Sequence, residues 1–242
     1  MMTIIFGANG AGKSSLMAHL LNQSAFDYER IRAGREEVQR LNEAFGYNIP
    51  TPKHFTYVNG TAIFQRNGYS KRMNLSLDPA RLGIQSEAPE GVKCQFILPY
   101  ATLGIDEAQT WFPSRDGAVQ NYQFSFFEKH RHNNLNILFS TTRAKLIDLR
   151  IRALCDAYYV KERPVDEDKN GNVKVTWYVD HIPVGCIDSY LDAGPTEQKY
   201  YCEKEKIVAK YNVFDIYDPT SCKTKFYEGF NGPDFNFTYG AL

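Results

Sequence analysis

A glycine-rich loop near the amino terminus constrains the fold more than any other feature of this sequence. Gly7 to Ser14 reads G-A-N-G-A-G-K-S and follows a short run of β-branched and aromatic residues at 3–6. Helical spacing resumes over 14–21, so the order is strand, glycine loop, helix. This order and this spacing are the pattern of a phosphate-binding (Walker A) loop. The alternative is a glycine-rich turn that matches the spacing by chance. Such a turn would need neither the strand before it nor the helix after it.

The loop predicts a nucleotide site with ATP and Mg²⁺ as its ligands. Glycines let several backbone N–H groups point at one anion, and the helix that follows adds its positive end. Lys13 is expected to reach the β and γ phosphates, and Ser14 to hold Mg²⁺. We assign nucleotide binding to the loop, the residue after it and one hydroxyl discussed below: Gly7, Ala8, Asn9, Gly10, Ala11, Gly12, Lys13, Ser14, Ser15 and Thr142.

Two acids follow a second apolar strand, predicted at 102–105. Asp106 and Glu107 come directly after it, which places Asp106 beside the loop as a second ligand of Mg²⁺. Glu107 is then positioned to polarise the attacking water, and a glutamate here favours hydrolysis over transfer to another acceptor. The alternative is a strand end capped by two solvated acids.

A third apolar strand, predicted at 135–139, ends at Ser140-Thr141-Thr142. Ligands of parallel α/β sheets bind at the carboxyl ends of the strands, so a hydroxyl here can sense the γ-phosphate. It can equally cap the helix that follows. Both interpretations stay open, and Thr142 is the residue assigned to the nucleotide.

Basic residues gather between positions 129 and 152. One of the arginines is a candidate finger that stabilises the transition state of a neighbouring subunit's nucleotide, and Arg131 is the first choice as a catalytic residue. The alternative for most of them is a solvated helix face. The set comprises Lys129, Arg131, Arg143, Lys145, Arg150 and Arg152.

Strands that alternate with helices predict an α/β P-loop NTPase with a mainly parallel sheet, helices on both faces and β-hairpin additions. Asn59-Gly60 predicts a hairpin between 55–58 and 61–64, and Asn170-Gly171 predicts another between 157–162 and 173–179. Helices are expected at 26–47, 118–131 and 145–154, and further strands at 73–77 and 213–217. We expect one domain over 1–242, with a core at about 1–162 and a β-rich elaboration at about 163–242.

Composition narrows the class of protein. The chain has 28 basic and 28 acidic residues, so it has no net charge that would attract polyanions, and any contact with a polyanion must come from a local basic patch.

The five cysteines are scattered without a C-x-x-C pair, which is typical of free thiols in a reducing compartment. No run approaches the ~18 apolar residues of a membrane helix. The expectation is a soluble chain that is not exported.

Four stretches together resemble the zonular occludens toxin (Zot) family, the assembly ATPases of filamentous phages. They are the amino-terminal loop, G-I-D-E-A-Q-T-W-F-P-S-R at 104–115, K-H-R-H at 129–132, and the strand at 136–142 leading into I-D-L-R-I-R at 147–152. The segment Y-N-V-F-D-I-Y-D at 211–218 is similar to the family's closing strand. The acid pair followed by Ala-Gln and Phe-Pro-x-Arg is the most specific part.

The resemblance implies an ATPase related to hexameric DNA-pumping motors. Such a homo-oligomer works in the host cytoplasm, at the cytoplasmic face of the inner membrane, with phage assembly proteins and single-stranded DNA as partners. Family members usually continue into a membrane helix and a periplasmic tail, which these 242 residues lack, so a membrane contact is expected only through a partner or a missing helix. Thr142 stands where the family is expected to have glutamine.

Three other functions remain as alternatives. The acid pair and the hydroxyls at 140–142 are similar to the acid box and hydroxyl motif of a helicase or other nucleic-acid translocase. A helicase of that class needs two nucleotide-binding folds, however, and the length of this chain offers one. An adaptor that binds ATP and switches partners with little turnover fits the same loop. A small-molecule kinase is less consistent with Glu107.

Overall fold

The computed structural model describes residues 1–66, 70–115, 117–162, 165–167 and 173–209, with 211, 213 and 216. Within these residues a central sheet of nine strands has the order β11-β10-β8-β1-β7-β6-β2-β5, and β9 pairs with β10. Its strands are β1 (Met2–Phe6), β2 (Thr56–Val58), β5 (Leu75–Ser76), β6 (Thr102–Ile105), β7 (Asn136–Thr141), β8 (Asp156–Glu162), β9 (Val165–Glu167), β10 (Val173–Ile182) and β11 (Glu203–Ala209).

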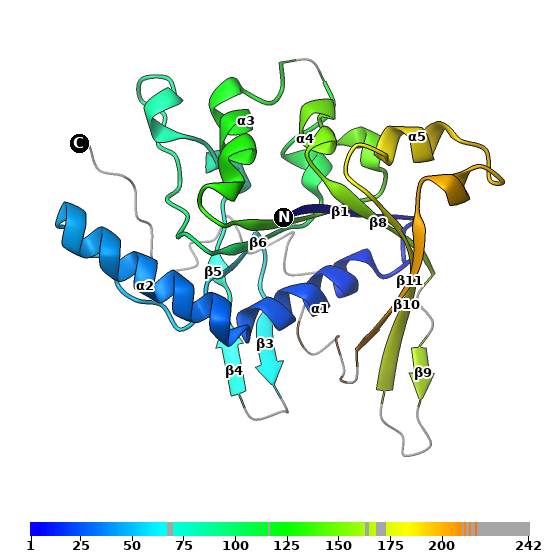
Figure 1. Cartoon of the computed structure of the whole chain (residues 1–242), viewed down its shortest axis with the longest axis horizontal. Coiled ribbons are helices and arrows are strands. Elements are labelled where there is room, and N and C mark those ends of the chain that lie inside the picture. The colour runs from blue at the N-terminus through cyan, green and yellow to red at the C-terminus, as the bar shows by residue number, and fades with distance from the viewer. Residues whose placement is uncertain are drawn as a thin grey trace.

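The middle of the sheet is parallel and buried on both faces. All pairs from β8 to β5 along the sheet are parallel, and every residue of β1 and β6 is buried. Helices α1 (Lys13–Ala25) and α2 (Tyr28–Phe45) lie on one side of the sheet, while α3 (Asn121–Glu128) and α4 (Leu149–Ala153) lie on the other (Figure 1). Continuous apolar strands therefore have a core on each face, as a parallel sheet requires.

Helix α1, which follows the glycine loop, packs against the sheet, and α2 lies on the same side of the sheet. Leu16, Met17 and Leu21 of α1 are fully buried against the sheet. Asp27 caps α2 by accepting a hydrogen bond from the backbone N of Arg30 at 3.1 Å. Gly46 ends this helix in the left-handed conformation, with φ of 69°. The amphipathic helix predicted at 26–47 is thus confirmed within two residues at each end.

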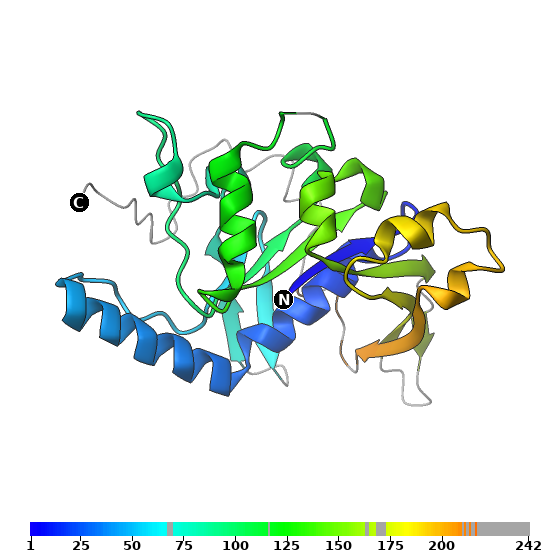
Figure 2. The same cartoon turned by 45° about the horizontal axis from the view of Figure 1, so that its top comes forward.

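The last strands extend the sheet beyond β8 with antiparallel pairing. β10 pairs with β8, β9 and β11, which lie at the end of the sheet opposite to α2 (Figure 2). The predicted hairpin partners at 157–162 and 173–179 are confirmed as antiparallel strands. The turn dipeptide Asn170-Gly171 and most of the strand predicted at 213–217 fall outside the described residues. Helix α5 (Ile187–Asp192) connects β10 to β11.

The hairpin predicted at Asn59-Gly60 is wrong. β2 ends at Val58 and pairs in parallel with β6 and β5, so it has no antiparallel partner in the next segment. A two-stranded hairpin does form later, between β3 (Ile63–Arg66) and β4 (Ser70–Met73). Burial of β2 inside the sheet outweighs the local turn preference of Asn-Gly, because its three residues are all buried.

Two predicted helices are shorter than expected. The helix expected at 118–131 begins at Asn121, because Gln120 and Gln123 form a capping box, and it ends in a 3₁₀ turn at Lys129–Arg131. The helix expected at 145–154 begins at Leu149, where the Asp148 side chain accepts from the backbone N of Arg150. Among the described helices, none is both long and apolar enough to cross a bilayer.

Candidate nucleotide site

The glycine loop leaves β1 at the carboxyl edge of the sheet and turns directly into α1. A Cβ atom at Gly7 would lie 2.3 Å from the carbonyl oxygen of Val160 in β8, so no larger residue fits. Gly12 has φ of 91° and starts the helix without a side-chain cap. The first turn of α1 carries no acidic residue. Its N–H groups and its positive end therefore remain available to an anion.

Lys13 lies against the loop and faces the acids of β6. Its Nζ donates to the carbonyl oxygen of Ala8 at 2.9 Å. Burial lowers the pKa of the Lys13 ammonium, whereas the carboxylates of Glu107 and Asp106 act to raise it. The lysine is thus held at the point where the loop and the two acids meet.

The Gly12 carbonyl is fixed by three donors, one of which comes from β10. Leu16 N donates at 2.9 Å and Ser15 Oγ at 2.8 Å. The indole Nε1 of Trp177, a fully buried residue, donates at 3.2 Å. The strands beyond β8 therefore contribute directly to the position of the loop, which the sequence did not reveal.

Ser14, Asp106 and Ser140 meet at the carboxyl ends of β6 and β7. Ser14 Oγ donates to the two carboxylate oxygens of Asp106 at 3.3 and 3.2 Å. Ser140 Oγ donates to the same carboxylate, and both Asp106 and Ser140 are buried. The two residues predicted to bind the metal are therefore adjacent, although they are 92 positions apart in sequence.

Glu107 is exposed, and its backbone adopts a conformation that is uncommon for residues other than glycine. Its φ is 52°, in the left-handed region, and its backbone N donates to Asp106 Oδ1 at 3.1 Å. Gln109 Nε2 donates to the Glu107 carboxylate. A left-handed non-glycine residue costs about 1–3 kcal/mol and is found preferentially at functional sites. Because of this backbone conformation, the side chain of Glu107 leaves the chain in a different direction from that of the preceding Asp106.

The Asn59 side chain forms hydrogen bonds with both the backbone N–H and the backbone C=O of Asp106. Asp106 N donates to Asn59 Oδ1 at 2.8 Å, and Asn59 Nδ2 donates to Asp106 O at 3.0 Å. Asn59 is buried and extends the pairing of β2 with β6 beyond Val58, because its backbone N donates to Gly104 O at 3.3 Å. The Asn-Gly dipeptide predicts a turn at Asn59, whereas the residue lies beside Asp106. A polar residue directly after a buried strand is the signal that points to this role.

Asn59→Ala is expected to slow turnover and to destabilise the fold. It leaves the buried N–H and C=O of Asp106 without these partners, and an unsatisfied buried group costs about 1–3 kcal/mol. We expect the free energy of unfolding to fall by about 2 kcal/mol, and kcat to fall more than ATP affinity, because the loop is untouched. Denaturant titration, ATP binding and steady-state turnover measure the three effects.

Asn42→Ala is the matched control for Asn59→Ala. Asn42 makes the same pair of amide hydrogen bonds with the backbone of Ile49, at 2.9 and 2.8 Å, at the far end of α2. It should lower stability by a similar amount and leave kcat unchanged. Equal losses of kcat in the two variants would show that Asn59 acts only through stability.

The three hydroxyls after the third strand have different surroundings. Thr141 pairs with Phe6 in the register of β7 and β1, so Thr142 comes level with Gly7 at the loop's edge of the sheet. Thr141 Oγ1 donates to Arg143 O at 3.2 Å. Neither threonine caps the helix that follows, because Asp148 caps α4. The position of Thr142 is compatible with its assignment to the nucleotide, while Ser140 holds Asp106.

The candidate finger Arg131 lies at the edge of the sheet opposite to the loop. It ends a 3₁₀ turn before β7, and it lowers the pKa of the Met1 ammonium, although less than burial and Arg30 do. It therefore does not reach the nucleotide loop of its own chain. Its side chain is exposed, so its predicted action on a neighbouring subunit stays a prediction.

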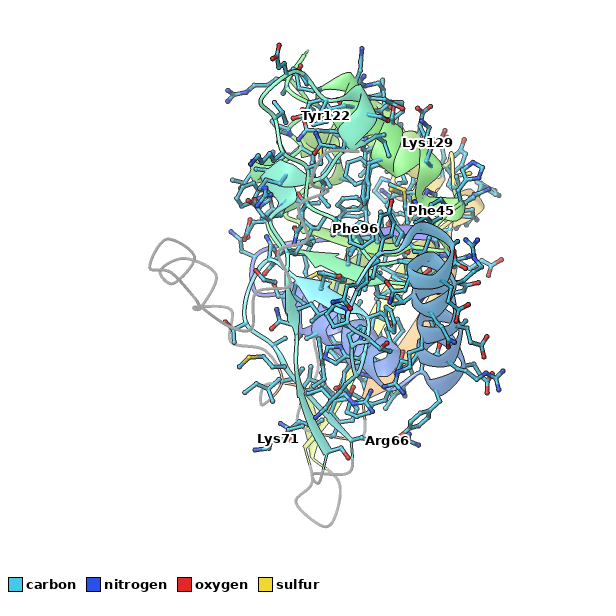
Figure 3. The ribbon with its side chains drawn as sticks, turned by 90° about the vertical axis from the view of Figure 1, so that its left-hand side faces the viewer. Phe45, Arg66, Lys71, Phe96, Tyr122 and Lys129 are labelled. Atoms are coloured by element: carbon cyan, nitrogen blue, oxygen red, sulfur yellow. The ribbon has the colours of Figure 1, made fainter. Side chains whose placement is uncertain are left out.

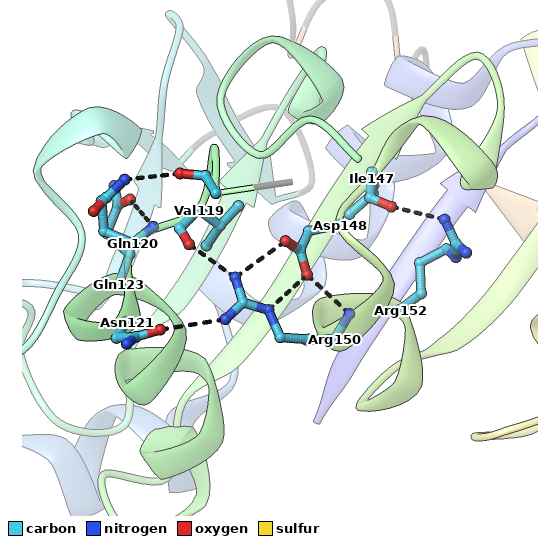
Figure 4. Close-up of polar contacts among 9 residues, drawn as sticks. Val119, Gln120, Asn121, Gln123, Ile147, Asp148, Arg150 and Arg152 are labelled. Carbon is cyan, nitrogen blue, oxygen red and sulfur yellow. Dashed lines mark hydrogen bonds and ion pairs between the residues drawn. The ribbon is translucent and has the colours of Figure 1, made fainter. Parts of the chain in front are cut away.

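Two other arginines of the basic set are engaged within the chain. Arg150 donates to Val119 O at 2.8 Å and contacts Asp148 at 3.2 Å (Figure 4). Its guanidinium group also lies over the Phe124 ring. Arg152 donates to Ile147 O at 2.8 Å and pairs with Asp188 at 3.0 Å. These contacts fix the guanidinium groups on the α3 and α4 side of the sheet.

The assembled residues fit a phosphate group and a hard divalent cation. The loop offers N–H donors and one ammonium, and it contributes no acid. Ser14 and Asp106 offer a hydroxyl and a carboxylate, the oxygen ligands that Mg²⁺ takes beside phosphate oxygens and water. No cluster of three or more His, Cys, Asp or Glu side chains occurs in the described part of the chain.

Comparisons with known proteins found similar solved structures and one matching family model. No sequence match to a curated protein was found. The N-terminal domain of zonular occludens toxin from Neisseria meningitidis is 16% identical, with 90% of this chain and 98% of that chain covered and a TM-score of 0.48. The genome packaging NTPase B204 of Sulfolobus turreted icosahedral virus 2, solved with ATP-gammaS, is 14% identical, with 70% and 78% covered and a TM-score of 0.36.

One protein-family model matches this chain. The model described as zonular occludens toxin (Zot) matches residues 1–166, which include the loop, both acids and all six strands of the parallel part of the sheet. Strand, glycine loop and helix, with the acid strand β6 separated from β1 by β7, form a P-loop NTPase fold. The chain belongs to the zonular occludens toxin (Zot) family.

Proposed function

We propose that this protein is an ATP-hydrolysing motor subunit. The observation that carries the proposal is the contact between Ser14 Oγ and the Asp106 carboxylate at 3.2 Å, which brings the helix of the phosphate loop to the acid strand. Lys13 and Glu107 flank this contact. A phosphate-binding group, a metal-binding pair and a general base thus share one edge of the sheet.

Each residue has a distinct role in hydrolysis. The loop N–H groups and Lys13 bind the phosphate oxygens and neutralise charge that increases in the transition state. Mg²⁺, when held by Ser14 and Asp106, supplies further neutralisation of the β and γ phosphates. Glu107 accepts the proton of the water that attacks the γ-phosphorus, while the bond to the bridging β–γ oxygen breaks and ADP leaves.

Ser140 and Asn59 keep the acids in position for this reaction. Ser140 donates to the Asp106 carboxylate and Asn59 holds the Asp106 backbone from both sides. A carboxylate fixed by neutral donors remains available to a metal, since none of these donors cancels its charge. Positioning of this kind lowers the reorganisation needed during the chemical step.

Membership of the Zot family supports the setting that we propose for the motor. The family resemblance implies assembly and extrusion of filamentous phage, with its single-stranded DNA, at the cytoplasmic face of the host inner membrane. Homo-oligomers, hexamers by the same resemblance, would then carry the DNA between subunits. Activity attributed to the toxin name is not part of this proposal.

Specific activity is expected to rise with protein concentration, because a neighbouring subunit completes the site. Arginine fingers supplied in trans contribute about 10³–10⁵ in rate. The test is to measure steady-state phosphate release and the oligomeric state together, over the range of protein concentrations in which the chain assembles. Arg131→Ala should abolish the rise while leaving assembly intact, and Arg143→Ala, at an exposed arginine near the loop's edge, is the comparison variant. A flat dependence for the wild type would contradict completion in trans.

A further inference from the structure

A group of cations gathers around the β3–β4 hairpin, and no carboxylate in the described part of the chain pairs with them. Arg66 and Lys71 lie at the end of the hairpin that points away from α3 (Figure 3). Arg72 lies on the same hairpin, and Arg35 and Lys53 lie beside it. Among the described residues, none of these five side chains is within ion-pair distance of an acid. Lys71 pairs with Gln65 in the hairpin register, so its side chain lies on the other face of the hairpin from Arg66 and Arg72. We call Arg35, Lys53, Arg66 and Arg72, together with Tyr28, the hairpin surface.

Two guanidinium groups of this surface converge on one carbonyl oxygen. Arg35 Nη2 and Arg72 Nη1 both donate to Lys53 O, each at 3.4 Å. Arg72 is half-buried, and burial lowers its pKa, with Arg35 and Arg66 adding to the lowering. Three like charges therefore influence one another here, and no carboxylate among the described residues forms an ion pair with any of them. The surface is complementary to an anionic ligand with several charges.

Neighbouring acids on α2 are already paired with other residues. Glu29 pairs with Arg32 at 2.6 Å, and Glu37 pairs with Arg40 at 2.5 Å. The chain as a whole is neutral, with 28 charges of each sign. The uncompensated hairpin surface is therefore a local feature, which is the kind of patch that an overall neutral protein needs in order to hold a polyanion.

Aromatic rings lie among the cations. Arg66 lies over the ring of Tyr28, 5.1 Å from its centroid, and Arg72 lies over Phe26 at 4.5 Å. Tyr28 is 57% exposed, so one side of its ring is accessible to a further flat group. Unpaired bases stack on exposed aromatic rings, whereas the bases of a duplex are already stacked on one another. Phosphate-binding cations beside an exposed ring favour a single strand over a duplex.

Helix α1 connects this surface to the nucleotide loop. The helix begins at Lys13, and at its other end Asn22 exchanges two hydrogen bonds with the backbone of Gln65 in β3, at 3.0 and 2.8 Å. Arg72 Nη1 donates to Ala25 O, the last residue of α1, at 2.6 Å. Thirteen helical residues span about 20 Å. One rigid element thus contacts the phosphate loop and the hairpin.

We propose that the hairpin surface binds the backbone and bases of single-stranded nucleic acid. The choice of a nucleic acid rests on the proposed motor function, whereas the surface itself is defined by its charges and rings. Arg66 and Arg35 contact phosphates, and Tyr28 stacks on a base. Binding here places the polymer at one end of α1 and the nucleotide at the other.

Fluorescence anisotropy of labelled oligo(dT), with the full chain and increasing salt, tests the proposal. Arg66→Ala and Arg35→Ala should each weaken binding about three- to tenfold at low salt and lower the slope of log K against log salt by about 0.7. Tyr28→Ala should weaken binding about 5- to 100-fold, and Tyr28→Phe should restore it. Arg32→Ala and Arg40→Ala remove exposed arginines that are paired with glutamates, and they should leave binding unchanged.

The outcomes separate this inference from the motor proposal. ATP turnover without DNA should be the same in all these variants, because none of them touches the nucleotide site. If the chain binds DNA through this surface but does not hydrolyse ATP, the inference holds and the motor proposal fails. Equal binding by surface and control variants, equal affinity for a duplex of the same length, or binding to anionic lipid vesicles in place of DNA would each overturn the inference.

Discussion

Lys13→Ala is expected to abolish ATP turnover and to weaken ATP binding strongly. Lys13 is the cation beside the loop, held by Ala8 O at 2.9 Å and facing Glu107 and Asp106. Without its ammonium, the two carboxylates repel the terminal phosphates, and charge that develops on the γ-phosphoryl group is no longer neutralised. Loss of one such donor lowers kcat by about 10²–10³. Isothermal titration with ATP and Mg²⁺ and steady-state phosphate release measure the two effects.

Lys129→Ala is the control for this variant. Lys129 is a half-exposed lysine whose ammonium pairs with Glu87 at 2.5 Å, on a 3₁₀ turn outside the nucleotide site. The Lys129→Ala substitution removes one positive charge from the chain and should leave ATP affinity and turnover unchanged. Thermal unfolding of both variants verifies that they fold. Wild-type ATP affinity in Lys13→Ala would show that this loop is not the nucleotide site.

Glu107→Gln is expected to bind ATP normally and to lose hydrolysis. The amide has nearly the shape of the carboxylate but cannot accept a proton from water. General-base catalysis contributes about 10²–10⁴ in rate, so kcat should fall by that factor while the ATP dissociation constant changes little. A single-turnover experiment with radiolabelled ATP separates bound ATP from product. Glu37→Gln, which alters an acid on α2 paired with Arg40, should behave as wild type.

This variant also distinguishes the motor from an ATP-gated adaptor. An adaptor that switches on ATP binding has little turnover to lose, so Glu107→Gln would match the slow wild-type rate. A motor has a wild-type rate well above that of Glu107→Gln. Equal steady-state rates for the two assembled proteins would remove the motor interpretation and leave the adaptor.

The sequence predicted the parts of the site that are continuous along the chain. Glycine spacing after an apolar run indicated β1, the loop and α1, and an apolar run ending in Asp106-Glu107 indicated β6, whose observed range matches the predicted one. These features depend on local patterns of burial and backbone conformation. The α/β class followed because alternation of strands and helices restricts the possible topologies.

Long-range partners could not be predicted in the same way. Asn59 was interpreted as a turn residue because Asn-Gly is a strong local signal, yet burial of β2 between β5 and β6 places it beside Asp106. Trp177 reaches Gly12 only because β10 joins the sheet next to β8, a register that the sequence does not encode locally. Contacts between residues separated by tens of positions depend on the complete sheet order.

The decisive experiment is a structure of the chain with a non-hydrolysable ATP analogue and Mg²⁺. The β and γ phosphates should lie within the loop from Gly7 to Ser14, with the metal bound by Ser14 Oγ and on the side of the Asp106 carboxylate. Glu107 should then face a water in line with the γ-phosphorus. Phosphates bound elsewhere, or acids directed away from an occupied loop, would contradict it.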